Sequence, residues 1–290
     1  MTTSTFHLPN GRPKTVIVTG GAGGIGAQTI RSYHVAGCNV VIADLPFAKN
    51  AADRVISSLS DPDRAMYHPT NIINWDDMRA LFREAKKRFG QVDIVVANAG
   101  LMESKGFYEF EEDKQGELEE PTEAYKIIDV NLKGSMNNLD GARGSVVLIA
   151  STSGYFGGTG VVSYISSKHG VVGLGRSSQR KANELGVRVN VVAPFFTPTY
   201  ITTGYSEKWK ERDLPANTVE GVASVIMETS IDPQRKGHSM LVAGSHVKEI
   251  ETARTTLTKE WLGEDIADVM AKGGKFFEDM GGYTLPKARS

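Results

Sequence analysis

The chain has 290 residues, with 33 Lys and Arg against 34 Asp and Glu, so its formal net charge is −1. This balance offers no excess charge for attracting nucleic acid or an anionic membrane, and we expect neither as a partner. Cys38 is the only cysteine, which excludes a disulfide framework and a multi-cysteine metal site, and no signal peptide or run of about 18 apolar residues is present, so we expect a soluble cytoplasmic protein without a metal.

Short runs rich in Val and Ile alternate along the chain with longer segments of helical period. The runs predict strands that are buried on both faces, as in a parallel sheet. These strands are expected at residues 15–19, 40–43, 92–97, 146–150 and 187–192, and short runs at 65–68 and 238–242 are expected to add two more. Helices are expected at residues 24–36, 48–59, 76–89, 122–139, 163–185 and 219–230. The alternation predicts an α/β fold, a single doubly wound Rossmann-type domain whose parallel sheet is flanked by helices.

No sequence repeat or low-complexity linker divides the chain. Residues 14–245 are therefore expected to form one dinucleotide-binding and catalytic domain. Residues 246–290 are expected to form a C-terminal extension packed on the same domain, with helical character around 259–272. The acidic, polar stretch 103–120 is predicted to be a solvated loop that leads into the next helix.

A glycine-rich turn, Thr-Gly-Gly-Ala-Gly-Gly-Ile-Gly at residues 19–26, joins the first predicted strand to the first helix. Glycines allow the backbone to approach a pyrophosphate, and the helix N-terminus offers free amides. Asp44 stands about 20 residues further on, where a carboxylate accepts hydrogen bonds from a ribose diol. Its charge would repel a 2′-phosphate, and neither the turn nor Leu45 supplies an arginine. These residues predict NAD(H) rather than NADP(H) as the cofactor.

Tyr164 and Lys168 lie four residues apart in a predicted helix, so they share one face. An ammonium beside a phenol favours the phenolate and brings its pKa down from about 10 towards the working pH. A phenol tuned in this way can exchange a proton with a substrate alcohol. A Tyr and a Lys at this spacing are common on exposed helices, so the surrounding residues decide what the pair means.

With its surroundings, the pair resembles the site of the short-chain dehydrogenase/reductase family, and the match spans about residues 14–245. The residues that carry it stand in the family's order: the glycine turn, Asp44, Asn98-Ala99-Gly100, Asn131, Ser151, Tyr164 and Lys168. The resemblance implies that the turn binds the cofactor phosphates and that the segment after the fourth strand supports the sheet beside the cofactor. The cofactor-binding set is then Thr19, Gly20, Gly24, Ile25, Gly26, Asp44, Asn71 near the adenine, Asn98, Ala99, Gly100, Tyr164, Lys168 and Thr199.

The same resemblance assigns catalytic roles to four residues. Tyr164 is the general base in oxidation and the general acid in reduction. Lys168 stabilises the phenolate and holds the nicotinamide ribose. Ser151 donates a hydrogen bond to the substrate oxygen as its charge develops, with Thr152 and Ser153 as weaker stand-ins. Asn131 anchors a water that relays protons to Lys168.

The chain departs from the family pattern in two places. Phe195 follows Pro194 where the family usually has glycine, and phenylalanine cannot adopt the backbone freedom of glycine without strain. Only twenty residues separate Asn131 from Ser151, so the helix after Asn131 is short. Residues 132–139 as helix and 140–144 extended still suffice to cross the sheet. Because this helix packs between subunits in many relatives, a possible homodimer is expected to be weakened.

The substrate side is predicted to be apolar and aromatic, which suits a bulky hydrophobic secondary alcohol or its ketone. In this respect the chain is similar to fungal polyketide-pathway and hydroxyprostaglandin-type NAD-dependent dehydrogenases, which implies a role in secondary metabolism. Two alternatives stay open, a nucleotide-binding regulator or scaffold with little turnover and a non-redox cyclase or lyase. Residues expected to line the substrate side, or merely to pack its lid, are Met102, Tyr155, Phe156, Phe195, Phe196, Tyr200, Tyr205 and Trp209.

Overall fold

The computed structural model of the chain describes residues 12–138 and 144–286. The chain divides into two compact units, one that ends at Lys248 and one that begins at Glu249. The predicted boundary at 245 lies close to this division. The predicted packing of the C-terminal extension on the first domain stays a prediction.

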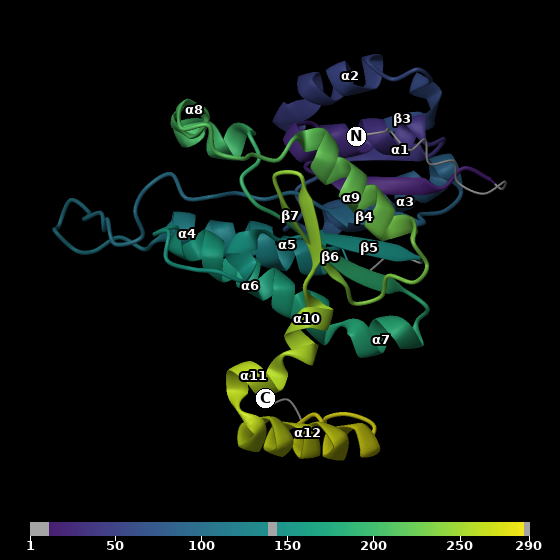
Figure 1. Ribbon diagram of the computed structural model, residues 1–290. Helices are drawn as coiled ribbons and strands as arrows, with labels where there is room; N and C mark the ends of the chain where they lie inside the picture. The colour runs from purple at the N-terminus through teal and green to yellow at the C-terminus, as the bar shows by residue number, and fades with distance from the viewer. Residues whose placement is uncertain (1–11, 139–143, 287–290) are drawn as a thin grey trace. The chain divides into compact units, whose positions relative to one another are not determined.

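The described residues contain an eight-stranded sheet with the strand order β3-β2-β1-β4-β5-β6-β7-β8 (Figure 1). The pairs from β3 to β7 are all parallel. The strands are β1 (Thr15–Thr19), β2 (Asn39–Asp44), β3 (Ala65–Pro69), β4 (Ile94–Ala97), β5 (Ser145–Ile149), β6 (Arg188–Pro194), β7 (Ser239–Ala243) and β8 (His246–Glu249). The strand order reverses between β1 and β4, and the crevice outside the carboxyl ends of strands at such a point is where open α/β sheets bind ligands.

The seven predicted strands are confirmed, with boundaries that move by one or two residues. Strands of this kind can be predicted from the sequence because a strand such as β1 is buried at every position, so its sequence is a continuous apolar run. The eighth strand, β8, was not predicted. It has four residues, of which three are exposed, so it carries no apolar pattern. The two-residue connection Gly244-Ser245 makes β7 and β8 a hairpin.

Helices cover both faces of the sheet. On one face α1 (Gly24–Val35), α2 (Lys49–Ser57) and α9 (Val219–Ile231) contribute Ile30, Val55 and Ile226 to a buried cluster. On the other face α3 (Trp75–Phe89), α6 (Val162–Ser177) and α7 (Gln179–Glu184) contribute Leu81, Val171 and Ala182 to a second cluster. Short 3-10 turns lie at Pro46–Ala48, Pro62–Arg64, Thr152–Gly154 and Tyr200–Thr202.

Two helical predictions need correction, and one helix was missed. The helix predicted at 163–185 divides at Ser178 into α6 and α7. The helix predicted at 122–139 is α4 (Thr122–Ile128), a π-helical turn at Asp129–Lys133 and α5 (Gly134–Asn137), and its predicted last residue lies outside the described residues, as does most of the predicted extended segment 140–144. A further helix, α8 (Thr203–Glu211), was not predicted, because none of its residues is buried and its sequence therefore has no apolar period.

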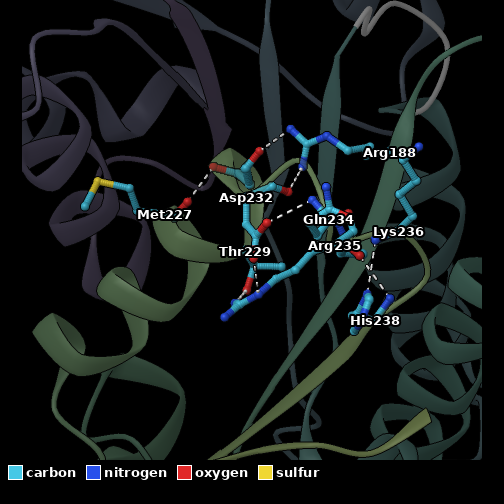
Figure 2. A network of polar contacts seen from close by, with 10 residues as sticks. Arg188, Met227, Thr229, Asp232, Gln234, Arg235, Lys236 and His238 are labelled. Atoms are coloured by element: carbon cyan, nitrogen blue, oxygen red, sulfur yellow. Dashed lines mark hydrogen bonds and ion pairs between the residues drawn. The ribbon is translucent and has the colours of Figure 1, made fainter. Parts of the chain in front are cut away.

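A polar network fixes the amino end of β6, at the edge of the sheet opposite the glycine turn. Arg188, the first residue of β6, donates to the backbone carbonyls of Asp232 at 2.7 Å and Ser230 at 2.5 Å. Arg235 donates to the Thr229 hydroxyl at 2.9 Å and lies 3.4 Å from the Asp232 carboxylate. Figure 2 shows these side chains gathered around the connection from α9 to β7. The network holds that connection in place and leaves the opposite edge of the sheet to the functional residues.

The second unit is helical, with α10 (Glu251–Thr256), α11 (Thr258–Leu262) and α12 (Glu264–Asp279). Lys259 and Asp268 form an ion pair of 3.6 Å between α11 and α12. The ring of Phe277 lies 5.3 Å from that of Phe276 and 4.1 Å from that of Tyr283. The helical character expected at 259–272 is confirmed. Among the described helices, none combines the length and apolar character needed to cross a membrane.

Candidate active site

The glycine turn forms a cradle that admits no side chain at its narrowest point. Gly20 and Gly24 have φ angles of 64° and 51°, in the left-handed region that favours glycine. A Cβ on Gly26 would stand 2.2 Å from the carbonyl oxygen of Gly20 and 2.7 Å from Nδ2 of Asn98. The residue before α1 is Gly23, so no side chain caps the first amides of this helix. These features fit a pyrophosphate, which needs a close backbone approach and free amides at a helix N-terminus.

Side chains from β1 and β4 fasten the cradle to the sheet. Asn98 donates through Nδ2 to the carbonyl oxygens of Thr19 at 2.9 Å and Gly20 at 3.2 Å. The Thr19 hydroxyl accepts from the backbone amides of Asn98 at 3.1 Å and Ala99 at 3.2 Å. Thr19 is fully buried, so its hydroxyl is used in hydrogen bonds within the protein and only its backbone faces the turn. Ile25 packs against the buried cluster of the α1 face.

Asp44, the last residue of β2, faces the glycine turn. Its two carboxylate oxygens accept from the backbone amides of Ala22 at 3.0 Å and Leu45 at 2.8 Å. A carboxylate offers about four acceptor positions, so each oxygen keeps one for a ribose diol. Asn71 lies just after β3, and its Oδ1 accepts from the amide of Ile73 at 3.3 Å.

Two arginines that lie near the glycine turn were not predicted from the sequence. Arg31 of α1 and Arg54 of α2 line a hollow together with Gly23 and Gly24. Thr199, from the loop after β6, lies against the same turn, since its Cγ2 is 3.2 Å from where a Cβ on Gly24 would stand. The absence of arginine from the turn and from position 45 therefore does not leave the turn without nearby cations.

Ser151, Tyr164 and Lys168 come together at the carboxyl end of β5. The Ser151 hydroxyl is hydrogen-bonded to the Tyr164 side chain and lies 3.3 Å from the carbonyl oxygen of Pro194. The Lys168 Nζ lies 5.5 Å from the centre of the Tyr164 ring and donates to the carbonyl oxygen of Ile149 at 2.9 Å. The lysine is therefore placed over the face of the ring on the shared side of α6.

The protein's own groups shift both titratable side chains towards their neutral forms. The pKa of Tyr164 is raised to about 12, and burial is the largest cause; the hydrogen bond with Ser151 acts to lower it, and the side chains of Tyr205 and Glu103 act to raise it. Burial lowers the pKa of Lys168 to about 8. The prediction that Lys168 lowers the pKa of the phenol is therefore wrong for the protein without its cofactor. Desolvation of the buried phenol has the largest effect on its pKa and raises it. A phenol that keeps its proton at neutral pH is suited to donating it.

Asn131 lies in the π-helical turn and is almost fully buried. Its side chain accepts from the Leu101 amide at 2.8 Å and donates to the Leu101 carbonyl at 2.9 Å and to the Ser167 hydroxyl at 2.9 Å. A Cβ on Gly100 would stand 3.2 Å from Oδ1 of Asn131 and 3.6 Å from Nζ of Lys168, so this glycine keeps the space between them open. The predicted water relay stays a prediction. A π turn inside an α-helix often marks a functional site.

Glu103 and Ser167 contact the site but were not among the predicted residues. Oε1 of Glu103 accepts from the backbone amide of Tyr164 at 3.0 Å, and the Ser167 hydroxyl donates to the Tyr164 carbonyl at 2.7 Å. The prediction of a solvated loop at 103–120 holds for most of that stretch but is wrong for Glu103, which is partly buried. The sequence contained one indication that a distant residue caps α6. Val161, which precedes this helix, has no side-chain acceptor for the amides of the helix.

Aromatic side chains lie beside the site on the loop after β6 and on α8. The ring of Trp209 stacks on that of Phe196 at 4.2 Å and meets that of Phe195 edge-on at 5.6 Å. The ring of Tyr205 lies 5.6 Å from that of Phe196, and the Tyr205 side chain also acts to raise the pKa of Tyr164. Phe196 is buried and packs the lid, whereas Phe195 and Tyr205 are more than one third exposed.

The other predicted lining residues differ in how open they are. Tyr200 and Phe156 are 91% and 65% exposed, and Met102 is partly buried. Tyr155 packs against the buried cluster of the α6 face, with Arg176 over its ring at 5.6 Å. Tyr155 and Phe196 are therefore packed within the protein, whereas the rings of Phe156, Phe195, Tyr200 and Tyr205 are exposed.

The predicted backbone strain at Phe195 is wrong. Among the described residues other than glycine, Asp213 alone has a positive φ. The Phe195 amide donates to the carbonyl of Val242 at 2.7 Å, so the pairing of β6 with β7 continues through this position. Phe195 therefore does not need the left-handed backbone conformation that favours glycine.

Comparisons with known proteins agree with this geometry. The family model for short chain dehydrogenases matches residues 14–210. The chain is 29% identical to the short-chain dehydrogenase/reductase prx4 of Penicillium rubens, with 91% of this chain and 85% of that protein covered. It is 30% identical to the short-chain dehydrogenase/reductase ascJ of Acremonium egyptiacum, with 85% of each covered.

Among solved structures, the chain is similar to a short-chain dehydrogenase/reductase from Brucella melitensis described as a glucose/ribitol dehydrogenase. The TM-score is 0.71 at 25% identity, and 80% of this chain and 95% of that chain are covered. The fold, the glycine cradle and the family match agree: the chain belongs to the short-chain dehydrogenase/reductase family, whose members are oxidoreductases that use NAD(P).

Proposed function

We propose that the protein interconverts a bulky hydrophobic secondary alcohol and its ketone with NAD(H). The observation that carries this proposal is the convergence of Ser151, Tyr164 and Lys168 at the carboxyl end of β5, on the edge of the sheet where the glycine cradle lies. Proton transfer and hydride transfer need these two parts side by side.

In reduction, Tyr164 gives its phenolic proton to the carbonyl oxygen of the substrate as a hydride arrives at the carbonyl carbon. The nicotinamide, when bound, supplies this hydride and takes it back in oxidation. Ser151 donates a hydrogen bond to the same oxygen as its negative charge develops. The Lys168 ammonium stabilises the phenolate that remains. Oxidation runs these steps in reverse, with the phenolate as the base.

The directions of the two pKa shifts support ketone reduction at neutral pH. A phenol with a pKa near 12 keeps its proton there, so it is ready as an acid, whereas it must lose the proton first to act as a base. Lys168, with a pKa near 8, is charged below that pH. We therefore infer that ketone reduction is favoured near neutral pH and that alcohol oxidation gains as the pH rises.

NAD(H) is proposed over NADP(H) because Asp44 faces the glycine turn with a negative charge. The aromatic rings of Phe195, Tyr205 and Trp209 support a hydrophobic substrate. The similarity to two fungal short-chain dehydrogenases/reductases, together with this apolar substrate side, supports a place in secondary metabolism and a cytoplasmic location as further parts of the proposal.

A weakened homodimer is part of the proposal as well. In the part of the chain that the structure describes, the helix after Asn131 runs through the π turn to the end of α5 at Asn137, so it offers little surface to a second subunit. Two of the three glycines of α6 do not call for a partner, because a Cβ on Gly170 would stand 2.7 Å from Leu132 and one on Gly175 would stand 2.6 Å from Val191 of the same chain, whereas nothing among the described residues lies within 4 Å of a Cβ on Gly173. Light scattering that finds a tight dimer built on the segment after Asn131 would contradict this part.

The function is tested by screening hydrophobic ketones and secondary alcohols with NADH and NAD, and in parallel with NADPH and NADP, while following the nicotinamide absorbance. We expect turnover of aromatic or polycyclic substrates with NAD(H), and little with sugars or small acids. Product formation without any absorbance change would instead select a non-redox enzyme. Tight NADH binding with no turnover of any compound would select a regulator or scaffold.

A further inference from the structure

The helix that carries Tyr164 and Lys168 has no cap of its own. The residue before α6 is Val161, which has no side-chain acceptor for the helix's first amides. Glu103 fills this role from 61 positions earlier in the chain: its Oε1 accepts from the amide of Tyr164, the third residue of the helix, at 3.0 Å. A carboxylate at a helix N-terminus also interacts favourably with the helix dipole.

The backbone of Tyr164 is held on both sides. Its amide donates to Glu103, and its carbonyl accepts from the Ser167 hydroxyl at 2.7 Å. Ser167 in turn accepts from Asn131 at 2.9 Å. Glu103 therefore completes a polar chain around one residue, which is the arrangement expected where the position of a side chain matters.

The segment that carries Glu103 is itself fixed at both ends. Asn131 makes two hydrogen bonds to the backbone of Leu101, at 2.8 and 2.9 Å. Glu123 accepts from the Ser104 amide at 3.1 Å and from its hydroxyl at 2.6 Å. Glu103 stands between these anchors, so its carboxylate is held against α6 and does not swing with the exposed loop that follows.

The charge of Glu103 is not neutralised by a neighbouring cation among the described residues. Its Oε2 is buried and has no hydrogen-bond partner there. The ionisable groups that line the adjoining hollow are Lys105, Glu109, Glu111, Glu119, Glu120 and Glu123, and Lys105 is paired with Glu111 at 2.7 Å. The amides at the start of α6 are thus the positive partner of this carboxylate.

We propose that Glu103 is a positioning residue of the active site, whose carboxylate fixes the backbone of Tyr164 at the start of α6 and acts electrostatically on its phenol. This inference rests on the proposed function. The groups that act on the phenol come from four elements: Lys168 on α6, Ser151 after β5, Tyr205 on α8 and Glu103 after β4. Of these, Glu103 is the one carboxylic acid side chain, and it acts to raise the pKa of Tyr164.

Two substitutions separate the charge from the hydrogen bond. Glu103→Gln keeps an acceptor for the Tyr164 amide but removes the charge, so we expect the pH profile of alcohol oxidation to move to lower pH because the phenol releases its proton more readily. Glu103→Ala removes both, so we expect the same displacement together with a loss in kcat on the order of tenfold from the misplaced phenol. Glu123→Gln, in α4 and bonded to Ser104 through an acceptor oxygen that glutamine keeps, is the matched control and should leave the profile in place.

A second readout needs no substrate. Hydrogen–deuterium exchange at the start of α6 should be faster in Glu103→Ala than in the wild type, and close to wild type in Glu103→Gln and Glu123→Gln. Wild-type exchange in Glu103→Ala would overturn the proposal even in a protein with no turnover, which separates this failure from a failure of the proposed function. With turnover established, an unmoved pH profile in Glu103→Gln, or an equal shift in Glu123→Gln, would also overturn it.

Discussion

The two halves of the site are built on different physical terms. The cofactor half depends on space: its backbone is shaped by glycines, and a single Cβ at Gly26 would collide with Gly20 and Asn98. The catalytic half depends on charge and hydrogen bonds, since burial shifts the pKa values of both Tyr164 and Lys168 towards the neutral form of each side chain. Substitutions in the cofactor half are therefore expected to abolish cofactor binding. Substitutions in the catalytic half are expected to change the rate and the pH dependence of the reaction.

The largest effect is expected from steric change in the cofactor half. Gly26→Ala places a Cβ 2.2 Å from a backbone oxygen, so we expect the free energy of unfolding to fall by about 3 kcal/mol, at the upper part of the usual overpacking range, and NADH binding to be lost. Gly23→Ala is the matched control, because nothing lies within 4 Å of its Cβ and its φ is −147°. Thermal melting and NADH titration of both variants check this. Equal losses in the two variants would break the steric account.

The next effect is expected in the catalytic half. Lys168→Met keeps an apolar stem of similar length but removes the ammonium over the Tyr164 ring, so we expect turnover to fall at least about a hundredfold. The same change should stabilise the protein at pH 7 by on the order of 2 kcal/mol, because the wild type carries a buried charge whose pKa is lowered to about 8. Chemical denaturation and steady-state kinetics measure the two effects.

The pH dependence of this stability difference has a definite sign. The folded protein binds fewer protons at Lys168 than the unfolded chain between the lowered pKa of about 8 and the ordinary value of 10.5, so wild-type stability gains across this window. The advantage of Lys168→Met is therefore largest below pH 8 and closes as the pH approaches 10.5. A variant that is less stable than the wild type at pH 7 would contradict the burial argument.

The smallest effect is expected at Asp44, where charge selects between two cofactors within the sterically defined half. Asp44→Asn keeps an oxygen for the amide of Ala22 or Leu45 but no longer repels a 2′-phosphate. We expect NADPH to bind on the order of tenfold more tightly, about 1.4 kcal/mol, while NADH binding weakens slightly. The double variant Asp44→Asn/Arg54→Ala should lose part of this gain, because Arg54 lines the hollow beside the turn. Unchanged NADPH affinity in Asp44→Asn would argue against charge as the selector.

The same contrast explains what the sequence could predict. The strands β1, β2, β4, β5 and β6 were predictable because burial on both faces leaves continuous apolar runs, and the glycine cradle was predictable because its conformation depends on the glycines themselves. Helix α8 and strand β8 were missed because they bury too little to produce a pattern.

At the catalytic half, the residue types were predictable but their environment was not. The spacing of Tyr164 and Lys168 placed them on one face, yet the direction of their pKa shifts depends on how deeply the fold buries them. Glu103 reaches Tyr164 across 61 positions of sequence, and its acidic neighbours made it look like part of a solvated loop. Long-range contacts of this kind leave no periodic trace in a sequence.

The central claim is that the Tyr164 hydroxyl carries the proton in an NAD(H)-dependent redox step. The most direct measurement compares Tyr164→Phe with the wild type on a substrate from the screen, with NADH binding titrated alongside. Phenylalanine keeps the ring under Lys168, so NADH affinity should stay within about twofold, while kcat should fall about 10²- to 10⁴-fold, the usual contribution of a positioned acid or base. A Tyr164→Phe protein that binds NADH normally and keeps full turnover would contradict the account.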